Sequence, residues 1–290
     1  MRRIADESAP TGLFSRTNRP QGTSMTDTPL PLCSRLPLAI DLPALLPALA
    51  QVPTEAWQTH FNHSYHEGDW SGVALVTAED SPLPLAPGLG APKNLAWWQG
   101  ETAWKTVLTP FQASLRAARL LRLGECARIH EHRDPDLGRP GGCLRLHVPL
   151  LSPPGVEFLV DGLQVPMRPG ECWFIDLSRP HRVNNPGPGE RIHLVLDCAA
   201  DPWLLALIKQ GLARTPTLQP GRAGQAFERF RRQVAESPAL AARLQALEDP
   251  RAFVAETVRL GAEHGLAFSD AEVLGAMRRG KQAWSDQWRA

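Results

Sequence analysis

Between residues 120 and 198, apolar side chains recur with a period of two in short runs that turn residues separate. Asp161-Gly162 has the composition of a type I′ hairpin turn, and Pro169-Gly170 marks a further turn. Short strands joined by such tight turns predict an antiparallel barrel or a double-sheet jelly roll. The runs are LLRLGECARIHEH, CLRLHVPLL, VEFLV, LQVPM, ECWFIDL, HRVNN and RIHLVLDC.

The residues before this region combine helical and extended patterns. Asp41 can N-cap a short helix over 42–50, in which Pro47 predicts a kink. Residues 57–80 have the pattern of an extended region. Apolar residues at three- and four-residue spacing predict a helical face over 101–119, with a break at Pro110.

From about residue 222 onward the apolar spacing becomes helical. Ser237-Pro238 and Asp249-Pro250 each place a proline directly after an N-cap residue, and Ser269 to Glu272 form a capping box. These signals predict a small all-α domain after the barrel. We divide the chain into a disordered extension (1–34, with Met25 as an alternative start), a β-barrel domain (35–205), a linker (206–224) and a helical domain (225–290).

Composition narrows the class of protein. Hydrophobic residues make up 43% of the 290 residues, which excludes a wholly disordered chain. The net charge of +1 argues against a nucleic-acid binder. No run of 18 apolar residues predicts a membrane span, and no apolar segment follows the N-terminal arginines as in a secretory signal. Five cysteines without a C-x-x-C pair favour reduced thiols, so we expect a cytoplasmic protein.

One group of residues has the chemistry of a metal centre. His132 and Asp134 stand two apart, so on a strand both side chains point to the same face. A closed sheet can bring His181, on a later strand, opposite this pair. Two imidazoles and one carboxylate are the facial triad of non-haem Fe(II) oxygenases. With nine histidines in the chain, packed histidines remain the alternative.

Arg191 follows His181 by ten residues, on the next predicted strand. A buried arginine there can form a bidentate pair with a dicarboxylate such as 2-oxoglutarate. The alternative is a solvated arginine on the strand surface.

The ordered segments HEHRDPDLG, LRLHVPLL, VEFLVDG and MRPGECWFIDLSRPHRVNNPGPGERIHLVLDC resemble the aspartyl/asparaginyl β-hydroxylase family, which includes related proline hydroxylases. The resemblance covers roughly residues 35–200. It implies a double-stranded β-helix, a cupin-like jelly roll, that uses Fe(II), 2-oxoglutarate and O₂. The implied activity is hydroxylation of an unactivated C–H bond of an amino acid, free or in a peptide or protein, with decarboxylation of 2-oxoglutarate to succinate.

The resemblance also implies roles for particular residues. Those that match the metal ligands are His132, Asp134 and His181, and Arg191 matches the arginine that binds the distal carboxylate of 2-oxoglutarate. A basic pair near the carboxylate of the cosubstrate or the substrate is matched by Arg145 and His147.

Further residues are candidates for the substrate pocket. Trp70 and Ser71 lie in the upstream segment HFNHSYHEGDWSGVAL, and Trp70 is equally a cap for the barrel mouth. Arg128 or Arg145 can pair with a substrate carboxylate. We expect surface or pocket-rim histidines, not a second metal site, at His60, His63 and His66.

The tail FERFRRQVAESPALAARLQALEDPRAFVAETVRLGAEHGLAFSDAEVLGAM is similar to Nif11-type domains, known mostly as leader regions of ribosomal peptide natural products. It is a candidate site for a peptide or protein partner, and a helical docking or stability module is favoured over a role in peptide maturation. Two other functions stay open: a non-catalytic jelly roll that binds a small acid or docks a peptide, and another cupin-type metalloenzyme. The oligomeric state is not predicted.

Overall fold

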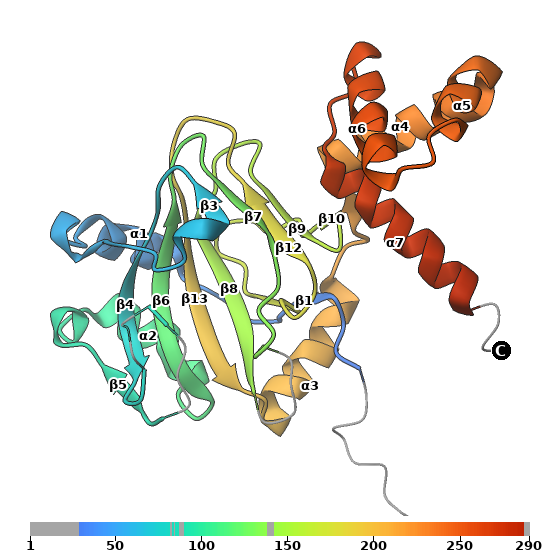
Figure 1. Cartoon of the computed structure of the whole chain (residues 1–290). Coiled ribbons are helices and arrows are strands. Elements are labelled where there is room, and N and C mark those ends of the chain that lie inside the picture. The colour runs from blue at the N-terminus through green and yellow to red at the C-terminus, as the bar shows by residue number, and fades with distance from the viewer. Residues whose placement is uncertain (1–28, 82, 84, 87–89, 138–141, 287–290) are drawn as a thin grey trace, which may run out of the picture.

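Two antiparallel sheets face each other in the computed structural model, which describes residues 29–286 except 82, 84, 87–89 and 138–141. The larger sheet has the order β1-β11-β8-β13-β6-β4-β2, with β5 beside β4 (Figure 1). Its strands are β1 Cys33–Arg35, β2 Gln58–Thr59, β4 Trp70–Ala78, β5 Pro92–Asn94, β6 Leu115–Leu123, β8 Cys143–Leu151, β11 Trp173–Ile175 and β13 Arg191–Ala199.

The smaller sheet has the order β14-β10-β9-β12-β7-β3. The turn between its β9 and β10 contains Asp161 and Gly162, whose φ angles of 50° and 76° confirm the type I′ prediction. The fold is therefore the expected jelly roll. Its strands are β3 His66–Glu67, β7 Arg128–His132, β9 Glu157–Val160, β10 Leu163–Gln164, β12 His181–Asn184 and β14 Gln219–Pro220.

Strand β13 lies at the centre of the larger sheet and is buried on both faces. Its even-numbered residues join a core beneath the helices, whereas Arg191, His193 and Asp197 belong to the opposite face. The same alternation on β8 places Leu146 in the helix-covered core and Arg145 on the face toward the smaller sheet. The polar side chains of the site thus come from the inner face of a strongly hydrophobic sheet.

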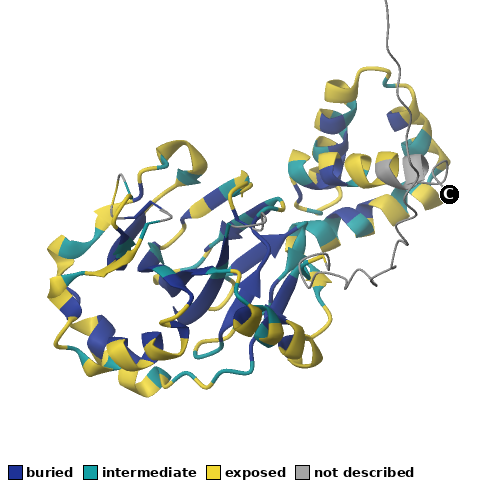
Figure 2. Cartoon of the chain, turned by 90° about the horizontal axis from the view of Figure 1, so that it is seen from below, coloured by how far each residue is buried: buried dark blue, intermediate teal, exposed yellow. Residues whose placement is uncertain are grey.

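Three helices cover the outer face of the larger sheet: α1 Leu42–Ala50, α2 Thr102–Leu108 and α3 Pro202–Gly211. Asp41 caps α1 by accepting a hydrogen bond from the Ala44 amide, as predicted, and Pro47 lies inside the helix. In Figure 2 the buried strands are enclosed between these helices and the second sheet. Short 3-10 helices cover Thr54–Ala56, His63–Tyr65, Ala96–Trp98, Thr109–Phe111 and Leu212–Arg214.

The helix predicted over 101–119 is wrong in its second half. Regular helix ends at Leu108, a 3-10 turn spans Thr109–Phe111, and Leu115 already begins strand β6. Pro110 cannot donate the helical hydrogen bond, and β6 pairs along its length with β4 and β13. The spacing of Leu115 fits a helix and a strand equally well, so the spacing did not distinguish them.

The C-terminal helices stand at one side of the barrel, next to the smaller sheet (Figure 1). Their own core centres on Phe227, Phe230 and Phe268. The predicted caps are present: the Ser237 and Asp249 side chains accept from amides at the starts of two helices, and Glu272 accepts from Ser269. The helices are α4 Arg222–Glu236, α5 Pro238–Gln245, α6 Pro250–Glu263 and α7 Asp270–Asp286.

The segment expected as a linker, 206–224, contains regular structure. Its first residues complete α3, where Ile208 is buried in the barrel core, and β14 pairs with β10. No comparison tests the division into domains, which stays a prediction. The expected disordered extension lies mostly outside the described residues. Within the described chain, no helix is long and apolar enough to cross a membrane.

Candidate metal centre

A cavity of about 700 Å³ opens between the two sheets. Its walls combine apolar side chains such as Leu121 and Phe158 with a set of titratable groups. Most of these groups come from β6, β8 and β13 of the larger sheet and from β7, the residues just after it and β12 of the smaller sheet. They include Arg119, His132, Asp134, Arg145, His147, His181 and Arg191.

His132, Asp134 and His181 lie together in this cavity, with one ligand atom of each within 4.8 Å of the others. The antiparallel pairing of β7 with β12 puts His132 directly opposite His181, and their ring centroids are 4.2 Å apart. Asp134 lies just beyond β7, where its amide donates to the Leu177 carbonyl. The three residues are arranged as the facial triad that a divalent transition metal takes.

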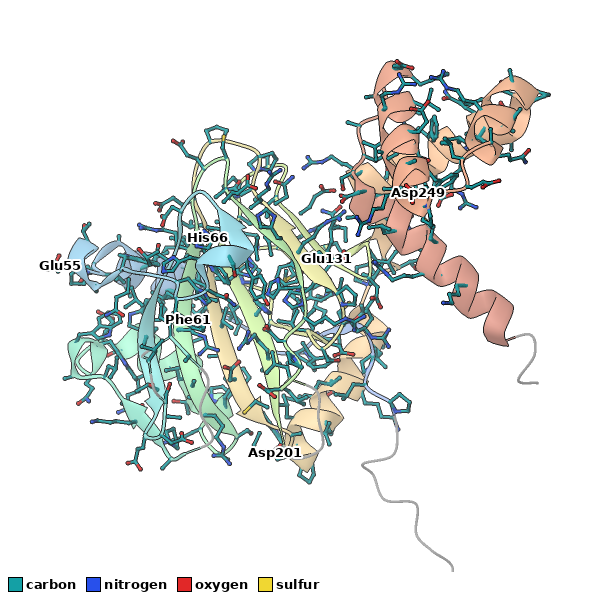
Figure 3. The ribbon with its side chains drawn as sticks, viewed as in Figure 1. Glu55, Phe61, His66, Glu131, Asp201 and Asp249 are labelled. Atoms are coloured by element: carbon teal, nitrogen blue, oxygen red, sulfur yellow. The ribbon has the colours of Figure 1, made fainter. Side chains whose placement is uncertain are left out.

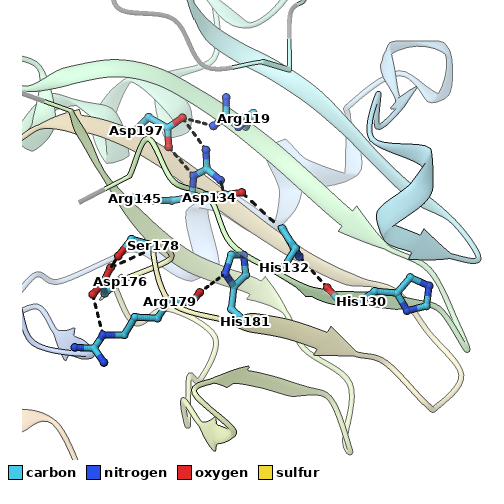
Figure 4. Close-up of polar contacts among 10 residues, drawn as sticks. All are labelled: Arg119, His130, His132, Asp134, Arg145, Asp176, Ser178, Arg179, His181 and Asp197. Atoms are coloured by element: carbon cyan, nitrogen blue, oxygen red, sulfur yellow. Dashed lines mark hydrogen bonds and ion pairs between the residues drawn. The ribbon is translucent and has the colours of Figure 1, made fainter. Parts of the chain in front are cut away.

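Both histidines have a defined tautomer (Figure 4). His132 Nδ1 lies 2.8 Å from the His130 carbonyl oxygen, and His181 Nδ1 lies 3.0 Å from that of Arg179. A carbonyl can only accept, so each Nδ1 donates its hydrogen, and the Nε2 atom of each ring is the nitrogen that can bind a metal ion. Burial, helped by the neighbouring His132, lowers the pKa of His181 to about 4, which keeps its ring neutral and able to bind a metal.

A network of ion pairs fixes the position of the Asp134 side chain. Arg145 Nη1 donates to Asp134 Oδ2 at 2.8 Å, while its Nε and Nη2 donate to the two carboxylate oxygens of Asp197. Arg119 contacts Asp197 as well (Figure 4). Asp197 is ionised, because the two arginines outweigh its burial and hold the pKa of its carboxyl well below the usual range. Arg145 thus fixes one oxygen of Asp134 and leaves the other facing His132.

Arg191 also lines the cavity and is 2% exposed. Its Nη2 is 2.8 Å from His193 Nδ1, its Nε has no partner among the described residues, and no carboxylate there pairs with it. Burial lowers the pKa of Arg191 to about 9, so the guanidinium is still charged at neutral pH. A buried cation without a counter-charge is unfavourable, and an anionic ligand would relieve that cost.

His147 stands beside this arginine, and both of its ring nitrogens lack partners among the described residues. Burial and the nearby Arg191 hold the pKa of His147 well below its usual value, so the ring is neutral. The Phe158 ring contacts the pair, with its centroid 5.7 Å from the Arg191 guanidinium carbon and 5.2 Å from the His147 centroid. Arg191 Nε and both ring nitrogens of His147 are therefore buried polar atoms without a hydrogen-bond partner among the described residues.

Of the three candidate substrate residues, one lines the cavity and two do not. Trp70 lines the cavity, where it stacks on His60 at a centroid distance of 3.5 Å. Ser71 is buried away from the cavity lining and accepts from Arg122 Nε. Arg128 is half exposed and pairs with Glu67 on the neighbouring strand β3. The strand face on which each residue falls explains the difference, since alternate residues point to opposite sides.

The remaining histidines make no second metal centre in the part of the chain that the structure describes. His60 lines the cavity, whereas His130 is 41% exposed in its side chain and faces Glu67. Sequence reasoning missed Arg119 and Asp197. The available signal was a charged residue inside a run that is otherwise apolar, in AARLLRL and RIHLVLDC.

Two family models match the chain. Residues 46–201, more than half of the chain, match the model described as aspartyl/asparaginyl beta-hydroxylase, and residues 223–273 match the Nif11 domain. The first match contains every residue of the cavity described above.

The comparison with solved structures gives matches at low identity and low TM-score. A 2OG-Fe(II) oxygenase family oxidoreductase from Burkholderia pseudomallei is 17% identical, with 54% of this chain and 77% of that chain covered and a TM-score of 0.38. A Pseudomonas putida prolyl-4-hydroxylase is 15% identical over 58% of this chain and 91% of that chain, with a TM-score of 0.36. Because these values are low, the assignment rests on the sequence match: the chain belongs to the aspartyl/asparaginyl beta-hydroxylase family of enzymes and carries a Nif11 domain after its barrel.

Proposed function

We propose that this protein is an Fe(II)- and 2-oxoglutarate-dependent dioxygenase that hydroxylates an amino acid, free or within a peptide. The observation that carries the proposal is the convergence of His132, Asp134 and His181 in a cavity that Arg191 also lines, a buried cation with no carboxylate partner among the described residues. Neutral imidazoles and a carboxylate suit Fe(II), and a set of three protein ligands leaves coordination positions for a cosubstrate and O₂.

In this proposal the two ends of 2-oxoglutarate have different partners. Arg191 binds the distal carboxylate through charge-assisted hydrogen bonds, which also give its unpartnered Nε an acceptor. His147, next to Arg191, donates or accepts a further hydrogen bond with the bound 2-oxoglutarate. The keto-acid end of the same molecule then reaches the candidate metal ligands. One of these ligands, His181, stacks on Phe158 at a centroid distance of 6.4 Å.

The chain's own residues orient and protect this chemistry. Bound Fe(II) with 2-oxoglutarate and O₂ supplies the oxidising power for an unactivated C–H bond, and 2-oxoglutarate is converted to succinate and CO₂. The carbonyls of His130 and Arg179 fix the ligand rings, and Arg145 fixes Asp134. Leu121, Phe158 and Leu177 line the cavity with apolar surface that excludes water.

The two alternative functions make different predictions for the same cavity. A binding module has no need for Fe(II) when it takes up an acid. A cupin-type metalloenzyme of another kind has no need for the unpaired Arg191. Membership of a hydroxylase family, together with Arg191 and the three ligands in one cavity, favours the dioxygenase.

The proposal is tested by anaerobic titration calorimetry of the full chain with 2-oxoglutarate, with and without Fe(II). We expect Fe(II) to tighten binding, and Arg191→Met to weaken it by about ten- to a hundredfold, since a hydrogen-bonded charge is lost. Arg122→Met is the matched control, because Arg122 pairs with Asp69 and Glu190 outside the cavity. Equal affinity in the wild type and Arg191→Met, or no effect of Fe(II), would contradict the proposal.

A further inference from the structure

Strand β7 contains a β-bulge directly beside a candidate metal ligand. His132 pairs with His181 of β12. The next pair is Ile129 with Val183, so two residues of β7 lie opposite one residue of β12. Both Ile129 and His132 line the cavity, although residues three apart on a regular strand point to opposite faces. In this bulged pairing, the extra residue therefore turns the His132 side chain into the cavity.

The regular pairing, without the bulge, would give a different site. Continued in regular register from Ile129, β7 would place Glu131 opposite His181. Because a shift of one residue moves every side chain to the other face, Glu131 would then enter the cavity and His132 would leave it. The His130 carbonyl, which accepts the Nδ1–H of His132, belongs to the same bulge (Figure 4). The arrangement of the candidate ligands thus depends on which pairing β7 adopts.

The smaller sheet supports the bulge from one side only. Strand β3 pairs with β7 at Arg128 and Ile129, so β12 is the only strand that lies beside His130 and Glu131 in the described chain. A bulge also leaves its extra residue out of the ladder of hydrogen bonds. Contacts from outside the sheet are therefore able to decide between the two pairings.

A chain of alternating charges holds Glu131 outside the cavity. Arg182 of β12 lies 3.9 Å from Glu131 and also pairs with Glu272 of α7. Arg278 of α7 lies 3.3 Å from Glu131. The Glu272 and Arg182 side chains are 6% and 19% exposed, so solvent screens this pair only in part. In the regular pairing Glu131 would leave both arginines, and the charges on α7 therefore favour the bulged pairing.

We propose that helix α7 of the Nif11 domain helps to assemble the candidate metal centre by stabilising the bulged pairing of β7. The positioning residues are Glu131, Arg182 and Glu272, none of which lines the cavity. This inference rests on the proposed function and gives the second domain a part in it. Loss of the α7 contact weakens metal binding, because the two events are linked through the pairing of β7.

The test compares the full chain with two Glu→Gln variants in the helical domain. Glu272→Gln removes the charge that faces Arg182 but keeps an oxygen that can accept from the Ser269 amide in the helix cap. Glu256→Gln is the matched control, since Glu256 pairs with Arg243 inside the helical domain. Circular dichroism verifies that both variants are folded.

Two measurements are made on each protein. Anaerobic titration calorimetry with Fe(II) alone gives the affinity of the metal centre. We expect Glu272→Gln to weaken Fe(II) binding about fivefold or more, and Glu256→Gln to leave it unchanged. Hydrogen exchange is recorded without metal. In Glu272→Gln the amides of β7 and β12 should exchange faster than in the wild type, whereas those of β4 in the larger sheet should be unaffected.

Three results would overturn the inference. Glu272→Gln could bind Fe(II) as tightly as the wild type, or its β7 amides could exchange at the wild-type rate. Equal weakening of Fe(II) binding in Glu256→Gln would assign the effect to lost stability of the helical domain, not to the contact with Arg182. Failure of the wild-type protein to bind Fe(II) would instead overturn the proposed function, and this inference with it.

Discussion

Buried charge is concentrated at one corner of the barrel, where Asp197 accepts hydrogen bonds from two arginines. The side chain of Asp197 is 1% exposed, that of Arg119 is 3% exposed and that of Arg145 is 13% exposed. Such a network is stable only when every charge has its partner, because one unpaired buried ion is costly. The network keeps Arg145, and through it Asp134, in one position.

We predict that Asp197→Asn lowers the stability of the folded protein. The substitution leaves two buried arginines without their shared carboxylate, so the free energy of unfolding at pH 7 should fall by about 3–5 kcal/mol. Urea unfolding followed by circular dichroism measures it. Asp69→Asn, at an exposed pair with Arg122, is the control and should cost less than about 1 kcal/mol.

The difference in stability between the wild type and Asp197→Asn should also depend on pH. The pKa of Asp197 is lowered in the folded state, so its contribution is complete above the unfolded pKa near 4 and declines as pH falls below that value. The difference in stability between the wild type and Asp197→Asn should therefore be constant from pH 7 to about 5 and shrink by about 1.4 kcal/mol per unit below about 4. A difference that grows in acid would contradict this account.

The elements that carry the site are short strands joined by tight turns. The turn before β12 is held by Asp176, which accepts from the amide and hydroxyl of Ser178 and from Arg179 Nε. The carbonyl of Arg179 in this turn accepts the Nδ1–H of His181. The turn therefore sets the direction of one candidate metal ligand before any metal binds.

We predict that Asp176→Ala weakens Fe(II) binding about tenfold without unfolding the barrel, since the support of a ligand histidine is lost. Anaerobic calorimetric titration with Fe(II) measures the change. Asp161→Asn is the control: Asp161 pairs with the same Arg179 from the other side, and asparagine tolerates its positive φ. A folded Asp176→Ala protein with wild-type Fe(II) affinity would refute the positioning role of this turn.

The strands were predictable from sequence because their signal is local. The period of two over β8, β12 and β13, and the turn at Asp161-Gly162, need no knowledge of the rest of the chain. The approach of His132 to His181 followed from the resemblance and from closure of the sheet. The Arg119–Asp197 pair could not be found this way, because it depends on the register of β6 against β13, which distant residues determine.

The dependence on strand register also explains why Ser71 and Arg128, two of the substrate candidates, do not line the cavity. Arg128 and Ser71 have polar side chains and lie in segments near the candidate ligands, but the face that a strand presents to the cavity is fixed only when its partner strand is known. The boundary at Leu115 failed for a related reason. A strand and a helix both place apolar residues four positions apart on one side, and pairing with β13 decides between them.

In the whole molecule, charged side chains join the Nif11 domain to the strands that carry the candidate metal ligands. Arg182, next to His181 on β12, pairs with Glu272 at the start of α7. Glu131, next to His132 on β7, lies 3.3 Å from Arg278 of α7. Figure 3 shows Glu131 on the side of the barrel that faces these helices. The helical domain is thus held against the backs of the two strands whose inner faces carry the histidines.

We predict that Arg182 and Glu272 are energetically coupled. Their side chains are 19% and 6% exposed, so the pair is partly desolvated, and a double-mutant cycle with Arg182→Met and Glu272→Gln should give a coupling of about 1 kcal/mol or more. Hydrogen exchange of the α7 amides in the full chain supplies the opening free energies. The exposed pair Glu228 and Arg231 on α4 is the control and should give less than about 0.5 kcal/mol. Coupling no larger than in this control would show that the ion pair does not hold the domain.

In the proposed function, one cavity binds Fe(II) and 2-oxoglutarate together. Anaerobic addition of Fe(II) and then 2-oxoglutarate to the full chain tests this, with the visible absorption spectrum recorded after each step. We expect a weak charge-transfer band that needs both additions and disappears in Asp134→Ala and in His181→Ala. A band that persists in both variants, or no band although the wild-type protein has bound Fe(II) and 2-oxoglutarate, would contradict it.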